Sequence, residues 1–181
     1  GVVLACFGDP GLYLLKEYCE MPVIGIAEAA MSLALLLGAK FGILVAMRRA
    51  VELMDSMVRT YGLESRYAGA HPLELRVLEL ERDRAETLER LALAGRALRG
   101  RGAEVLLLGC AGLTTFVDEL QTQTEMPVID PVEAGCRMLQ SVSAAKLRTS
   151  NIGLYAESAP QRMNNLERVF SSQVAGILSS R

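Results

Sequence analysis

Short apolar runs alternate along the chain with longer stretches in which apolar and polar positions recur at helical spacing. The apolar runs predict strands at Val2–Cys6, Pro22–Ile26, Phe41–Ala46, Glu104–Cys110, Pro127–Asp130 and Asn151–Ala156, with a weaker strand near Tyr67–Ala70. The stretches between them predict helices near residues 11–19, 28–38, 48–61, 74–100, 114–123 and 132–146. Strands that alternate with helices are typical of parallel sheets covered by helices, so we expect an α/β fold.

The apolar run from Ala29 to Met47 is long enough to suggest a membrane span on hydropathy alone. However, Gly38-Ala-Lys40 has the composition of a helix end, and the residues from Phe41 to Ala46 read as a strand. We therefore predict a helix, a turn and a strand here, and no interaction with a membrane.

An internal repeat is the most informative feature of the sequence. The segment Val3-Leu-Ala-Cys6-Phe-Gly8 matches Leu107-Leu-Gly-Cys110-Ala-Gly112, since each gives an apolar strand, a cysteine, one residue and a glycine. Each copy then reaches the same four residues, Met21-Pro-Val-Ile24 and Met126-Pro-Val-Ile129, followed by the acidic helix starts Glu28-Ala29 and Glu133-Ala134. The repeat predicts two similar lobes related by a pseudo-twofold axis, each with one cysteine.

The repeat also suggests how the chain is divided. We expect residues 1–38 and 148–181 to form the first lobe and residues 39–147 the second. A strand opens at Phe41, 69 residues before Cys110, whereas only five residues precede Cys6. We therefore expect about 60 residues from the N-terminal part of the first lobe to be missing from this sequence. A further helix is expected around residues 162–170, followed by a Ser-rich end that is expected to be disordered.

Composition narrows the classes of partner. The 181 residues are 51% hydrophobic and 22% charged, with a net charge of −2 and no basic stripe, so no nucleic-acid partner is expected. The four cysteines have no C-x-x-C spacing and His71 is the single histidine, which argues against a zinc site. Scattered thiols of this kind predict a reducing, cytoplasmic location.

The two repeated cysteines have the setting of reactive thiols. Cys6 and Cys110 each follow a predicted parallel strand and precede a glycine and a helix, and ligands of open α/β sheets bind at such strand ends. A helix N-terminus favours negative charge and hence a thiolate. Two opposed thiols suit racemisation, because one removes a proton from a carbon and the other returns one from the opposite face.

A carbanion formed in this way needs its charge spread into a neighbouring carbonyl. Backbone N–H groups at Phe7, Gly8, Ala111 and Gly112 are candidates to hold that oxygen. A buried packing role is the alternative for any lone cysteine. The matched positions beside glycines favour catalysis for Cys6 and Cys110, whereas Cys19 and Cys136 are interpreted as packing residues within helices.

Other polar residues support structural interpretations. Glu28 and Glu133 are expected to favour the first turns of their helices rather than to contact substrate. Asp9-Pro10-Gly11 predicts a turn that starts a helix. Asp130 ends a strand beside the expected cleft, and His71 is placed in a loop at the surface or in packing.

These motifs resemble the hydantoin racemase branch of the aspartate/glutamate/hydantoin racemase superfamily, which includes allantoin racemases. The resemblance covers about residues 1–157, and it is carried by Ala5–Leu12, Pro22–Ala30, Leu108–Leu113 and Pro127–Pro131. It implies two α/β lobes with the active site between them, a two-cysteine mechanism without metal or other cofactor, and assembly into homo-oligomers. The chain departs from the family in lacking its N-terminal Asn-Pro-Asn-type segment and in carrying Val45-Ala46 where relatives have substrate-facing threonines.

The sequence therefore predicts a cofactor-independent racemase whose small-molecule substrate is a 5-substituted hydantoin or allantoin, with Val45 beside the substrate. An Asp/Glu racemase, a related isomerase or a decarboxylase is the sibling alternative. A non-catalytic small-molecule-binding relative and a redox dithiol that forms a Cys6–Cys110 disulfide belong to other classes. Stable free thiols would oppose the redox alternative, and ligand-induced stabilisation without turnover would favour the binding relative.

Overall fold

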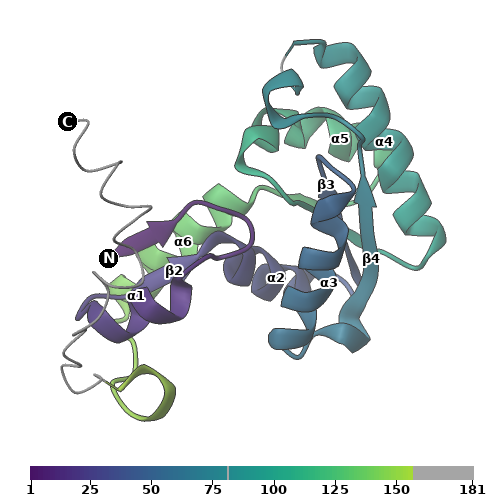
Figure 1. Ribbon diagram of the computed structural model, residues 1–181. Helices are drawn as coiled ribbons and strands as arrows, with labels where there is room; N and C mark the ends of the chain where they lie inside the picture. The colour runs from purple at the N-terminus through teal and green to yellow at the C-terminus, as the bar shows by residue number, and fades with distance from the viewer. Residues whose placement is uncertain (81, 157–181) are drawn as a thin grey trace, which may run out of the picture.

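The computed structural model describes residues 1–80 and 82–156, whose strands form two parallel sheets (Figure 1). The smaller sheet pairs β1 (Val2–Leu4) with β2 (Val23–Gly25). The larger sheet has the order β4-β3-β5-β6, with β3 at Phe41–Val45, β4 at Tyr67–Pro72, β5 at Val105–Leu108 and β6 at Val128–Ile129. All of these pairings are parallel, which confirms the predicted α/β class.

Helices cover both sheets. The α-helices are α1 (Leu12–Tyr18), α2 (Ile26–Leu37), α3 (Arg49–Thr60), α4 (Arg84–Gly100), α5 (Val117–Thr124) and α6 (Pro131–Ala144). Short 3-10 helices lie at η1 (Glu64–Arg66), η2 (Val77–Glu79), η3 (Ala111–Phe116) and η4 (Gly153–Tyr155). In each copy of the repeat, a helical segment connects the two parallel strands, as parallel pairing requires. This segment is α1 in the first copy and η3 with α5 in the second.

The larger sheet is buried on both faces, because successive side chains of a strand point to opposite sides. Ile43 and Leu107 belong to a hydrophobic cluster with residues of α2 and α3. Leu44 and Leu106 belong to a second cluster with residues of α4 and α5. All five residues of β3 are buried, so this central strand reads as a continuous apolar run.

Helices α2 and α6, which follow the two copies of the repeat, pack against each other and join the two sheets. Helix α2 contacts β3, β5 and β6 of the larger sheet as well as β2, and α6 contacts β1 and β2 of the smaller sheet. A Cβ atom added at Gly135 of α6 would lie 3.1 Å from side-chain atoms of both Ile26 and Val3, so the absent side chain permits this approach. The two sheets consequently share one hydrophobic cluster.

The apolar run that suggested a membrane span forms a helix, a turn and a strand, as predicted. Helix α2 ends before Gly38, and β3 begins at Phe41. The Arg66 guanidinium holds the turn between them by donating to the carbonyl oxygens of Gly38, at 2.8 Å, and of Ala39. Across residues 1–80 and 82–156, no helix combines the length and the apolar character needed to cross a membrane.

Two predicted elements were wrong. Helix α4 begins at Arg84 rather than at residue 74, because Asp83 caps it by accepting a hydrogen bond from the Glu86 N–H at 3.0 Å. The segment at 151–156, expected as a strand, is instead irregular and contains the 3-10 helix η4, and Ile152 is 80% exposed. The helix expected around residues 162–170 lies outside the described residues, as does the Ser-rich end.

We predict that Gly109→Ala destabilises the protein by about 1–3 kcal/mol, since an added methyl group overpacks a rigid site. A Cβ atom there would lie 2.7 Å from the backbone carbonyl oxygen of Leu44 and 2.9 Å from Cγ1 of Val45. Chemical denaturation measures the change. The matched control is Gly100→Ala at the end of α4, where no atom beyond the adjacent residues and the helix's own backbone lies within 4 Å of the added carbon. Equal destabilisation of both variants would contradict the prediction.

Candidate active site

Cys6 lies two residues beyond the end of β1, in a tight and exposed loop. The Asp9 N–H donates to the Cys6 carbonyl oxygen at 3.0 Å and closes a turn around Phe7 and Gly8. Gly8 has φ +143°, a conformation that favours glycine, whereas Phe7 is buried. The loop is therefore anchored by one aromatic side chain and leaves the Cys6 thiol exposed.

Cys110 lies two residues beyond the end of β5, at the position that caps η3. The preceding Gly109 donates its N–H to the Leu44 carbonyl oxygen at 2.7 Å, which fixes this turn to the central strand. Cys110 is half-buried and packs against the hydrophobic cluster on the α4 and α5 side of the sheet. The N–H groups of Ala111 and Gly112 open a 3-10 helix and have no partner within it.

The two cysteines occupy equivalent places in the repeat. Val3 pairs with Ile24 in the smaller sheet, and Leu107 pairs with Ile129 in the larger sheet, so both copies form the same parallel unit. Phe7, next to Cys6, belongs to the hydrophobic cluster that joins the two sheets, and Ala111, next to Cys110, packs against this cluster. The loop after β1 lies on the side of the smaller sheet that faces the larger one (Figure 1).

Val45, expected beside the substrate, ends β3 and is only 1% exposed. Its Cγ1 lies beneath Gly109, and its carbonyl oxygen accepts a hydrogen bond from the Leu73 N–H at 2.8 Å. In this arrangement Val45 supports the backbone turn that carries Cys110. Ala46, which follows it, is also buried.

The sequence analysis missed the role of Asp9, which holds the Cys6 loop through three hydrogen bonds. Its carboxylate accepts from the N–H groups of Ala27 at 3.1 Å and Glu28 at 2.9 Å, both in the first turn of α2. It also accepts from the Tyr61 hydroxyl at 2.7 Å, at the end of α3. Asp9 is 7% exposed and has φ +46°. The repeat held a signal for this role, because the residue before α2 is Gly25 whereas its counterpart before α6 is Asp130. A glycine cannot cap a helix with a side chain, so the cap of α2 had to come from elsewhere.

Burial is the main cause that raises the pKa of the Tyr61 phenol above its ordinary value, and the hydrogen bond to Asp9 raises it further. Burial likewise raises the pKa of Tyr67, whose hydroxyl donates to the Asp55 carboxylate at 2.7 Å. Both phenols therefore stay protonated, and Tyr61 stays a hydrogen-bond donor to Asp9, well above neutral pH.

Most of the other polar residues have structural partners. Glu28 accepts from the Gly25 N–H at 3.1 Å and pairs with Lys16 at 2.7 Å. Glu133 pairs with Arg137 on the exposed surface of α6. His71 lies in β4 rather than in a loop.

The two remaining cysteines do not pack inside helices as expected. Cys19 follows the end of α1 and is half-buried, and Cys136 is exposed on α6. Across residues 1–80 and 82–156, no three His, Cys, Asp or Glu side chains converge in a way that could hold a metal ion.

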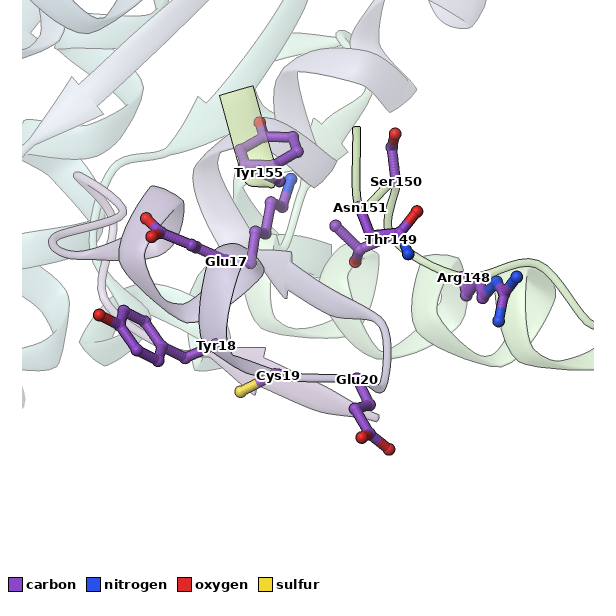
Figure 2. Close-up of a pocket in the computed structure, with 10 residues that line it drawn as sticks. Glu17, Tyr18, Cys19, Glu20, Arg148, Thr149, Ser150, Asn151 and Tyr155 are labelled. Carbon is purple, nitrogen blue, oxygen red and sulfur yellow. The ribbon is translucent and has the colours of Figure 1, made fainter. Parts of the chain in front are cut away.

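Two cavities border α1, and neither is lined by Cys6 or Cys110. A cavity of about 370 Å³ is lined by Gly8 and Tyr13 together with Leu53 and Met57 of α3. A larger one, of about 550 Å³, lies between the end of α1 and the segment at 148–155; Figure 2 shows Cys19 and Glu20 on one wall and Arg148 on the other.

Comparisons with known proteins agree on one family. The sequence model of the Asp/Glu/hydantoin racemase family matches residues 1–139. The chain is 36% identical over 154 residues to the hydantoin racemase of Pseudomonas sp. (strain NS671), covering 84% of this chain and 62% of that protein. It is 39% identical over 154 residues to the hydantoin racemase of Paenarthrobacter aurescens, covering 84% of this chain and 65% of that protein. The chain thus spans less than two thirds of the length of these curated relatives.

Solved structures give the same result for the fold. An allantoin racemase from Pseudomonas fluorescens superposes with a TM-score of 0.85 at 33% identity, covering 89% of this chain and 69% of that one. A glutamate racemase from Bacillus anthracis superposes with a TM-score of 0.61 at 14% identity, covering 96% and 69%, and this likeness shows the fold alone.

We predict that Tyr61→Phe flattens the loss of stability at alkaline pH. Below the ordinary pKa of 10.0, Tyr61 is protonated in both states and its full contribution is present. Above that pH the unfolded chain loses the proton while the folded chain keeps it, so stability falls as pH rises. Urea denaturation between pH 8 and roughly pH 11 measures this slope.

Tyr67→Phe is a parallel test, because the pKa of Tyr67 is also raised by burial, and it should flatten the alkaline slope in the same way. Asp9→Asn should reduce only the Tyr61 contribution, because Tyr67 is bonded to Asp55 instead. An alkaline slope that is unchanged by Tyr61→Phe would refute the assignment.

Proposed function

The chain belongs to the Asp/Glu/hydantoin racemase family, and on that premise we propose that Cys6 and Cys110 are the two acid/base thiols of a cofactor-independent racemase. The observation that carries the proposal is their equivalent placement. Each thiol stands two residues beyond a parallel strand, in two sheets that share one hydrophobic cluster. Ligands of α/β folds bind at this edge of a sheet.

The proposed reaction removes a proton from one face of a carbon and adds a proton to the opposite face. The thiolate sulfur of one cysteine takes the proton from a carbon next to a carbonyl, and the electron pair of that bond moves into the carbonyl. The thiol of the other cysteine then gives its proton to the opposite face, and the carbonyl is restored. The cysteines exchange roles for the other enantiomer, so each is acid in one direction and base in the other.

Backbone N–H groups are proposed to hold the oxygen on which charge develops. Ala111 and Gly112 present theirs at the start of η3, next to Cys110. Phe7 and Gly8 present theirs in the turn next to Cys6. Donors fixed in a turn cost no reorganisation when the carbanion forms, which is the source of their effect on rate. Val45 is proposed to lie beside the substrate without making a polar contact to it. Its role in this proposal is to support Gly109 and the turn that carries Cys110.

The proposed substrate is a 5-substituted hydantoin or allantoin. The relatives named as hydantoin racemases and the structural neighbour named as an allantoin racemase support this class, at 33–39% identity. A ring amide acidifies the carbon proton by delocalising charge into the carbonyl, so a thiolate is a sufficient base. Assembly into a homo-oligomer stays a prediction from the resemblance, and a cytoplasmic location stays a prediction from the scattered thiols.

We predict that Cys6→Ser and Cys110→Ser each lower racemisation by at least about a hundredfold, since a serine hydroxyl is a far weaker acid than a thiol. Single enantiomers of allantoin and of 5-substituted hydantoins are incubated in heavy water with the full-length protein. Optical rotation and deuterium at the ring carbon are followed together. Racemisation should be accompanied by uptake of one deuterium per inversion.

Cys136→Ser, on the exposed surface of α6, is the matched thiol control and should racemise at the unmodified rate. Full activity in either active-site variant would sink the two-thiol mechanism. Substrate-induced stabilisation of the unmodified protein without turnover would support a binding relative of the family instead.

A further inference from the structure

The two repeats cap their equivalent helices in different ways. Helix α6 is capped by its own preceding residue, because the Asp130 carboxylate accepts from the N–H groups of Val132 at 2.8 Å and Glu133 at 3.3 Å. The residue at the same position before α2 is Gly25, which has no side chain but keeps the extended backbone of a capping residue, with φ −81° and ψ 141°.

The carboxylate of Asp9 fills the place of the missing cap. A Cβ atom added at Gly25 would lie 2.4 Å from Cγ of Asp9, so the two side chains cannot occupy this space together. Asp9 belongs to the Cys6 loop and reaches the first turn of α2 from 18 and 19 residues away in sequence. Its counterpart in the second repeat, three residues after Cys110, is the fully buried Leu113.

This exchange of cap ties the Cys6 loop to two other elements. Asp9 bonds α2 through two backbone N–H groups and α3 through the Tyr61 hydroxyl. Its own N–H donates to the Cys6 carbonyl oxygen, so a displacement of Asp9 is passed directly to the Cys6 backbone. Leu53 of α3 lies 3.6 Å from where a Cβ of Gly8 would stand, which places the loop against the same helix.

We propose that Asp9 is a positioning residue for the Cys6 thiol: it caps α2 from the Cys6 loop, and this fixes Cys6 relative to α2 and α3. The inference rests on the proposed role of Cys6 as an acid/base. A cap supplied by the residue that precedes α2, as Asp130 supplies it to α6, would stabilise the helix equally. It would leave the Cys6 loop without a bond to α2. The placement of the carboxylate therefore serves the loop, because misplacement of a catalytic group by about 1 Å costs on the order of a hundredfold in rate.

The deciding experiment exchanges the two residues in the variant Asp9→Gly/Gly25→Asp. The composition and net charge stay the same, glycine accepts the φ of +46° at position 9, and the backbone at position 25 already suits a capping aspartate. Removal of the Asp9 side chain also vacates the space that a new side chain at position 25 needs. Helix α2 is then capped by its own preceding residue, as α6 is.

Three readouts separate capping from positioning. Thermal unfolding reports the cap. Amide hydrogen exchange of residues 5–9, followed by mass spectrometry, reports the turn in which the residue-9 N–H donates to Cys6. Steady-state kinetics on the full-length protein report kcat and KM separately. Asp130→Ala is the matched control, because it removes the cap of α6 and leaves the Cys6 loop untouched.

The exchange variant should unfold only slightly below the wild-type temperature, because α2 keeps a cap and only the bond to Tyr61 is lost. Its loop amides should exchange about tenfold faster, as expected for loss of a hydrogen-bonded anchor. Its kcat should fall by roughly a hundredfold with a smaller change in KM. Asp9→Asn should give the same loop and kcat effects. Asp130→Ala should lower the unfolding temperature without changing exchange in residues 5–9.

The proposal is overturned if Asp9→Gly/Gly25→Asp keeps the wild-type kcat and the wild-type amide hydrogen exchange in residues 5–9. Asp9 would then be a helix cap only. If that variant fails to fold, Tyr61→Phe decides, because it keeps both bonds to α2 and removes only the bond to α3. Unchanged exchange in residues 5–9 of Tyr61→Phe would then count against positioning. An unmodified protein that racemises no substrate would contradict the proposed function, and the amide-exchange measurements would still decide the role of Asp9.

Discussion

The carboxylate of Asp9 is the contact on which the arrangement of this molecule depends, since it joins a loop of the smaller sheet to helices that cover the larger one. A buried carboxylate is costly unless its oxygens are satisfied, and here two backbone N–H groups and one phenol satisfy them. The unfilled N-terminus of α2 supplies two of these donors, and Gly25 supplies the room. Loop position, helix capping and the approach of α3 are therefore one interaction rather than three.

The second constraint is the packing of α2 against α6. Each helix follows one copy of the repeat and also contacts the sheet of the other copy, so the two sheets share the hydrophobic cluster that lies between them. Close approach at Gly135 permits this packing. Because the cysteine loops stand at the strand ends beside these helices, the shared core fixes them in one frame. The proposed two-thiol racemisation requires such a frame, since the two thiols would have to face opposite sides of a single carbon.

The two cysteine loops are nevertheless built differently. The Cys110 turn is held by β3, through the hydrogen bond from Gly109 and the side chain of Val45, and by the buried Leu113. The Cys6 loop has the polar anchor of Asp9 and the single buried ring of Phe7. An apolar anchor is fixed by packing on all sides, whereas a polar anchor depends on the position of each partner. The Cys6 loop thus depends on the partners of Asp9 in α2 and at the end of α3, whereas the Cys110 turn depends on β3.

The sequence by itself determined the parallel α/β class, most of the strands, the repeat and the equivalence of Cys6 and Cys110, because periodicity and local motifs act over a few residues. It misplaced the start of α4, since a dense run of Glu and Arg hid the local cap at Asp83, and it placed a strand at 151–156 where the structure has an irregular segment with a 3-10 helix. It read Asp9 as turn chemistry alone, and it gave no sign that Val45 packs beneath Gly109. Only the tertiary structure decided these points, because the partners of Asp9 lie 18 to 52 residues away in the chain and a hydrogen bond over that separation leaves no local pattern.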